Sequence, residues 1–94
     1  MVYHYSFRAY SLFLKNSGEE GYKFLKLMED DLQTLGGNPV MLQPMIGLAY
    51  AEAGAYHYRK KQFQKARDVL QKGLQIVPGH GEISERLRIV EDEF

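Results

Sequence analysis

The sequence contains no cysteine. This excludes a disulfide framework and a thiolate metal site, and it is compatible with the reducing cytosol, where we expect the protein to be located. No apolar run approaches the ~20 residues needed to span a bilayer. The first eight residues have neither the basic start nor the apolar stretch of a secretory signal. We therefore expect a soluble protein with no membrane partner.

The chain also lacks net charge, because twelve basic residues cancel twelve acidic ones. It has no broad positive field to support non-specific nucleic-acid binding, so we expect no nucleic-acid partner. It equally lacks the repulsion that keeps many small domains apart, which leaves self-association open. With 94 residues, of which 45% are hydrophobic and 26% charged, the composition predicts one folded domain over residues 1–94.

Clusters rich in glycine and proline divide the chain at 17–18, 36–39 and 78–81. Such clusters end helices and form turns. Between them the apolar residues recur at helical spacing, and no segment alternates as a strand does. The sequence therefore predicts an all-α protein. The expected helices run over about 2–15, 17–36, 44–60 and 63–77, and a C-terminal capping helix covers 82–94.

Local signals indicate two helix starts and the faces that should be buried. Ser17 and Glu20 have the spacing of a capping box, and Pro44 suits the first turn of a helix, where its missing N–H is not needed. On the last four helices, apolar spacing predicts the inward-facing side chains. These are Phe24, Leu25, Met28, Leu32 and Leu35; Ile46, Ala49, Tyr50 and Ala53; Phe63, Ala66, Val69, Leu70, Leu74 and Val77; and Ile83, Leu87, Val90 and Phe94.

Residues 47–80 carry a spaced set of aromatic, small and closing residues: Tyr50, Gly54, His57, Phe63, Ala66, Leu70 and Pro78. This pattern resembles the tetratricopeptide repeat (TPR), an antiparallel helix pair of about 34 residues. The resemblance implies that Gly54 and Ala66 let two helices approach closely where they cross. At three positions, Ala53, His57 and Gly73, the chain departs from the family's usual Leu, Tyr and Ala.

A less complete repeat of the same pattern lies nearer the N-terminus. Its members are Tyr5, Ala9, Gly21 and Leu25, each 45 positions before a residue of the clear repeat. Residues 2–35 would then form a degenerate helical hairpin, followed by an inserted connection over 36–46. Arg8 and Gln33 stand where the family has Leu and Pro. The alternative is that 2–35 are two amphipathic helices covering one end of the clear repeat.

The sequence offers little for catalysis or metal binding. His4, His57 and His80 are too scattered to form a metal set, and we expect His57 to pack in the core and His80 to be exposed. Glu82 and Ser84 are close to His80 in sequence, but no strained elbow or oxyanion loop accompanies them. We therefore expect no enzymatic activity, no cofactor and no metal site.

In the tetratricopeptide family, the first helix of each pair lines a concave ligand surface. The resemblance places that surface on Leu48, Ala51, Ala55, Tyr58 and Arg59. Because Ala51 and Ala55 stand where some members carry side chains that clamp a carboxylate, such a clamp is not supported. A groove of this composition suits a partly apolar helix or an extended peptide. The resemblance thus implies a protein-interaction module, an adaptor or scaffold.

The alternative function is a structural homo-oligomerisation domain, alone or within a larger protein. The first predicted helix carries more aromatic side chains than one neighbouring helix can cover. We therefore predict a homodimer through Tyr3, Phe7 and Tyr10 of that helix. The basic residues between 59 and 72 are interpreted as a solvated face.

Overall fold

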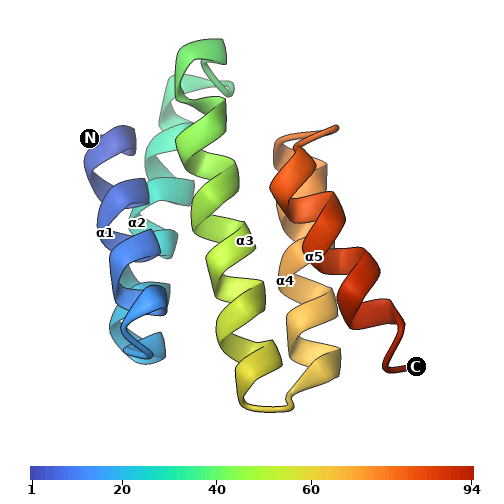
Figure 1. The fold of residues 1–94 in the computed structure, drawn as a ribbon. Helices are drawn as coiled ribbons and strands as arrows, with labels where there is room; N and C mark the ends of the chain where they lie inside the picture. The colour runs from blue at the N-terminus through green and yellow to red at the C-terminus, as the bar shows by residue number, and fades with distance from the viewer.

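The computed structural model describes all 94 residues and contains five α-helices and no strand (Figure 1). The helices are α1 (Val2–Leu14), α2 (Gly18–Leu35), α3 (Gln43–Arg59), α4 (Phe63–Ile76) and α5 (Gly81–Glu91), with a short 3₁₀ turn, η1 (Val40–Leu42), before α3. The all-α prediction is confirmed. The largest boundary difference lies at the C-terminal helix, which ends at Glu91 rather than at the end of the chain.

Glycine and proline mark some of the helix ends, as predicted, whereas the turns after α1 and α3 contain Asn16 and Lys61 in the left-handed conformation. Gly36 ends α2 in the left-handed conformation, with a φ of 74°, and Pro44 lies in the first turn of α3. The predicted capping box is wrong, because no side-chain hydrogen bond caps α2. Ser17 has a φ of −97° and a ψ of 66°, which is not the extended conformation that aims an N-cap side chain at the first turn.

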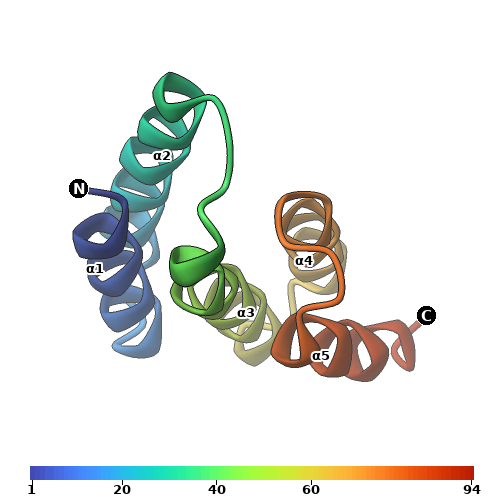
Figure 2. The same ribbon diagram turned by 90° about the horizontal axis from the view of Figure 1, so that it is seen from above.

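Consecutive helices run antiparallel and form two layers. Viewed from above, α1, α3 and α5 lie in one row, and α2 and α4 lie on the other side of it (Figure 2). The main helix contacts are α1 with α2, α1 with α3, α3 with α4, and α5 with both α3 and α4. α2 and α4 make few contacts with each other, so α3 provides most of the packing between the N-terminal pair and the C-terminal helices.

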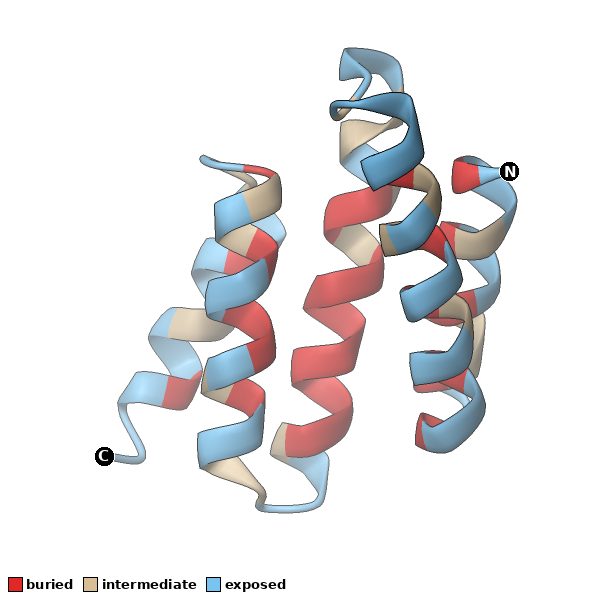
Figure 3. Cartoon of the chain, turned by 180° about the vertical axis from the view of Figure 1, so that it is seen from behind, coloured by how far each residue is buried: buried red, intermediate tan, exposed pale blue.

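α3 is the centre of the core. From Ile46 to His57 every residue except Leu48 is buried (Figure 3). A helix without a polar face belongs in the interior, and four alanines between 49 and 55 let neighbouring helices come close on several sides. The predicted inward residues of α3, Ile46, Ala49, Tyr50 and Ala53, are all buried.

Gly54 provides close packing between α3 and α4. An added Cβ there would overlap the side chain of Leu70, and Ala66 of α4 is fully buried as well. Because Leu70 is fully buried, its side chain needs the room that a missing Cβ leaves.

Two predicted core residues are exposed. Leu35 is 62% exposed because it is the last residue of α2, where the chain turns at Gly36. Phe94 is also exposed: it lies beyond the end of α5, and Arg67 stacks on its ring. The buried face of α1 consists of Val2, Ser6, Ala9 and Phe13, and hydrophobicity alone did not indicate it.

Candidate functional site

A groove between α3 and α5, here the α3/α5 groove, contains a cavity of about 180 Å³. Gly54, Ala55 and Tyr58 line it from α3, and Ile89 and Val90 line it from α5. Two arginines, Arg59 and Arg86, complete the lining. The groove thus presents a small apolar floor with positive charge beside it.

A buried carboxylate holds these two arginines in place. Glu52 has one oxygen 3.3 Å from Nη1 of Arg59 and the other 3.6 Å from Nη2 of Arg86. The Glu52 side chain is almost fully covered, whereas both arginine side chains are more than a third exposed. A buried charge is stable only when paired, so the arginines neutralise Glu52 from the solvent side and fix the spacing of α3 and α5.

Arg59 also forms hydrogen bonds with the C-terminal end of α1 and the residue that follows its cap. Its Nη2 donates to the backbone oxygen of Phe13 at 2.8 Å, and its Nε donates to Asn16 Oδ1 at 3.1 Å. Phe13 lies in the last turn of α1, where carbonyls lack partners within the helix. Arg59 therefore connects the end of α1 to α3, and a partner would meet a guanidinium that is already largely engaged.

The predicted partner-binding residues divide between surface and interior. Tyr58, Arg59 and Ala55 line the α3/α5 groove, and Leu48 is half-buried. Ala51 is 1% exposed and offers almost no surface to a partner. Sequence reasoning missed Arg86 and Ile89, because it assigned α5 to capping only. The spacing of Arg86, Ile89 and Val90, which places them on one side of a helix, was the available signal.

One stripe of apolar residues on α1, formed by Tyr3, Phe7, Tyr10 and Leu14, lies at the surface. Tyr3 is 58%, Phe7 49% and Leu14 52% exposed, and Tyr10 is half-buried. These residues lie about 100° around the helix from its buried face. Tyr5 and Arg8, which contact Phe24 of α2, lie on the other side of that face. The stripe therefore points away from α2. It lies on the side of the α1, α3 and α5 row that is not covered by α2 and α4 (Figure 2).

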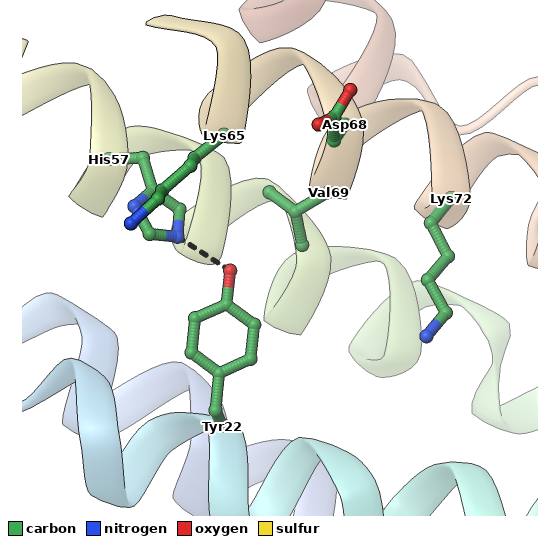
Figure 4. Close-up of a pocket in the computed structure, with 6 residues that line it drawn as sticks. All are labelled: Tyr22, His57, Lys65, Asp68, Val69 and Lys72. Carbon is green, nitrogen blue, oxygen red and sulfur yellow. Dashed lines mark hydrogen bonds between the residues drawn. The ribbon is translucent and has the colours of Figure 1, made fainter. Parts of the chain in front are cut away.

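A second cleft, here the α2/α4 cleft, lies over α3 on the opposite side of that row. Its first cavity, of about 370 Å³, is lined by Tyr22, His57, Lys65, Asp68, Val69 and Lys72 (Figure 4). The Tyr22 hydroxyl lies 2.6 Å from Nε2 of His57, and Nδ1 of His57 lies 2.8 Å from Gln62 Oε1. Because the Gln62 oxygen can only accept, Nδ1 carries the proton and Tyr22 donates to Nε2.

Burial controls the ionisation of both partners of this bond. It lowers the pKa of His57 below its ordinary value, and the charges of Lys65 and Lys60 lower it further, while the hydrogen bond to Gln62 opposes the shift. Burial also raises the pKa of Tyr22 to about 12. At neutral pH the pair is therefore uncharged. The prediction that His57 packs in the core is confirmed.

An ion pair crosses the same cleft further along. Nζ of Lys72 on α4 lies 2.9 Å from Oε2 of Glu29 on α2. That oxygen also accepts a hydrogen bond from the hydroxyl of Tyr50 below it. Burial, then the hydrogen bond to Glu29, raises the pKa of Tyr50 above its ordinary value. Beyond the ion pair, a second cavity of about 310 Å³ is lined by Glu29, Leu32, Gln33, Gly37, Asn38 and Ile76.

His80 is not exposed as predicted. Its ring covers Gly47, and its Nδ1 accepts weakly from the Ile83 amide at the start of α5. His80 therefore links this turn to α3. The Ser84 amide donates to the backbone oxygen of His80 at 3.1 Å, but no hydrogen bond joins the two side chains, and Ser84 is exposed. The chain contains no group of three or more His, Cys, Asp or Glu residues that could hold a metal ion.

The basic stretch is more engaged than a solvated face would be. Lys60 donates to the Tyr56 hydroxyl, and Arg67 lies 4.0 Å from Glu91. Lys61 and Lys65 are exposed and form no salt bridge. Free positive charge in this stretch is thus concentrated near the turn between α3 and α4.

No helix is both long enough and apolar enough to cross a membrane.

Comparison of the chain with protein-family models, curated proteins and solved structures gives no match. The α3/α5 groove, the α2/α4 cleft and the exposed stripe of α1 are therefore the features that indicate a function.

Proposed function

We propose that this chain is a protein-interaction module of the tetratricopeptide type, an adaptor or scaffold that binds a helix or extended peptide of a partner protein. The α3/α5 groove is the observation that supports the proposal most directly. Its apolar floor would receive one or two apolar side chains, and its arginines would orient polar groups beside them. The exposed stripe of α1 lies on the free side of the same row of helices and would lengthen the contact surface.

The test should change the groove without disturbing the fold. Arg59→Glu is unsuitable, because Arg59 also holds the end of α1 and neutralises Glu52. Ile89→Glu is better, since Ile89 lines the groove and is 37% exposed. Leu27→Glu is its matched control: Leu27 has the same exposure and lies on α2, outside the groove.

Peptides selected against the immobilised protein from a random display library would be measured by isothermal titration calorimetry. Ile89→Glu should weaken their binding at least about tenfold, as expected for a central contact residue, and Leu27→Glu should leave it unchanged. Equal affinities for the wild type and Ile89→Glu would remove the α3/α5 groove from the proposal.

The second candidate is a structural homodimer through α1, and the exposure of Tyr3 and Phe7 favours it. Clustered aromatic residues at a surface are typical of interfaces. Light scattering at several concentrations tests it, with Tyr3→Glu plus Phe7→Glu as the variant. The variant should stay folded, because both side chains are largely exposed, and should be monomeric where the wild type is dimeric. A wild type that is monomeric at every concentration would contradict this candidate.

A further inference from the structure

The α2/α4 cleft has the dimensions of a binding site. Its two cavities, of about 370 and 310 Å³, lie on either side of the Glu29–Lys72 ion pair. Each reaches the lower end of the range typical of ligand sites, roughly 300 to 1,000 Å³. The cleft runs along two helices, so its shape suits an elongated ligand better than a compact one.

Few contacts join the two sides of the cleft. At the second cavity, Nδ2 of Asn38 donates to the backbone oxygen of Ile76 at 2.6 Å, and no hydrogen bond spans the first cavity between α2 and α4. Glu29–Lys72 is the one salt bridge between these two helices. The Lys72 side chain is about half exposed, so solvent already competes for this contact. Glu29 would keep the hydrogen bond from Tyr50 if Lys72 turned to another carboxylate.

The α4 wall has an excess of positive charge. Lys65 and Lys72 are seven residues apart on α4, so they lie on one side of the helix, and both line the first cavity. Lys65 has no acidic partner, and Lys72 shares Glu29 with Tyr50. The carboxylate on this wall, Asp68, accepts from Gln64 and points away from Tyr22 (Figure 4).

Apolar surface lies between these cations. Val69 and the ring of Tyr22 face the first cavity, between Lys65 and Lys72 (Figure 4). Leu32 and Ile76 line the second cavity. On the α2 side, Lys26 and Asp30 neutralise each other at 3.2 Å. The cleft therefore complements a chain in which acidic and apolar side chains alternate.

We propose that the α2/α4 cleft is a second binding groove, which takes an acidic, partly apolar extended segment of a partner protein. One carboxylate of the segment pairs with Lys65 and another displaces Glu29 from Lys72. An apolar side chain between them packs on Val69 and Tyr22. This site is separate from the α3/α5 groove, because α3 lies between the two, and it does not depend on that groove being used.

The test uses the full chain, labelled with ¹⁵N, and an eight-residue peptide of alternating Glu and Leu as the probe. Amide shifts should change at Tyr22, Lys65, Val69 and Lys72 and stay constant at Ile89. Lys65→Glu should weaken binding about tenfold or more, since it replaces one charge-assisted contact with repulsion. Lys15→Glu makes the same charge change on α1, at another exposed lysine without a salt bridge, and should leave the affinity unchanged.

Four outcomes would overturn the proposal. They are no shift change at millimolar peptide, changes confined to the α3/α5 groove, equal weakening by Lys15→Glu and Lys65→Glu, and equal binding of the peptide with Lys in place of Glu. Ile89→Glu should bind the acidic probe as the wild type does. Failure here and failure of the proposed function are therefore distinguishable.

Discussion

Gly73 of α4 lies directly against Tyr50 of α3. A Cβ added to Gly73 would come within 2.7 Å of the Tyr50 Cβ, an atom that cannot move without its backbone. Tyr50 is fully buried and large, so α4 approaches it only where a side chain is missing. With Gly54 against Leu70, this gives α3 and α4 two neighbouring contacts in which a glycine on one helix faces a large side chain on the other.

Gly73→Ala should therefore destabilise the protein. Overpacking costs about 1–3 kcal/mol, against the roughly 1 kcal/mol by which alanine is favoured over glycine inside a helix. We expect a lower urea midpoint with an unchanged slope. Gly81→Ala is the control, because nothing lies within 4 Å of the Cβ it would add in the first turn of α5. A Gly73→Ala protein as stable as Gly81→Ala would show that the two helices separate easily.

Glu52→Gln should destabilise the fold by about 1–3 kcal/mol, because it removes a buried charge and weakens two charge-assisted contacts at once. Arg86→Gln should cost less, since Arg86 is partly exposed. Urea unfolding of both variants and of the double variant gives the coupling energy between the two sites. Additive effects would mean that Glu52 and Arg86 do not stabilise each other in solution.

The free energy of unfolding should fall as the pH drops below about 6.5. Burial lowers the pKa of folded His57 beneath its ordinary value of 6.5, so the unfolded chain binds the proton more readily. The stabilisation is complete above that ordinary value and is lost as the pH falls from it towards the folded pKa. Urea unfolding from pH 7.5 to 5 measures the slope, which should be smaller in His57→Gln and retained in His4→Gln, where the ring is exposed.

At alkaline pH, Tyr22 and Tyr50 should ionise later than a tyrosine of ordinary pKa. Burial raises the pKa of Tyr22 to about 12 and that of Tyr50 above its ordinary value. The folded state thus holds these protons more tightly, and stability falls as the pH rises above about 10. Part of the rise in tyrosinate absorbance should therefore come only at high pH, and Tyr22→Phe should reduce that late part. An unchanged late part in Tyr22→Phe would contradict the prediction.

The fold could largely be predicted from this sequence, because its helices have clear apolar spacing and because glycine and proline lie in the connections that follow α2 and α4. The buried face of α1 could not, since Ser6 and Ala9 are neither strongly apolar nor large. Ser6 is tolerated there because its hydroxyl donates to the backbone oxygen of Val2 at 2.7 Å.

The candidate sites were less predictable. Tyr58 and Arg59 could be placed beside the α3/α5 groove because the repeat resemblance gave them an orientation. The α2/α4 cleft could not be foreseen. Its residues come from different helices: Tyr22 and Glu29 from α2, and Lys72 from α4. The spacing of residues within one helix does not predict which helices become neighbours.

The central position of α3 has a consequence for how the chain folds. The buried faces of α1, α4 and α5 all meet this one helix, so neither a fragment ending at residue 42 nor one starting at residue 60 could cover its own apolar surface. Unfolding should accordingly be all-or-none, with amide hydrogens of α3 exchanging only through global opening.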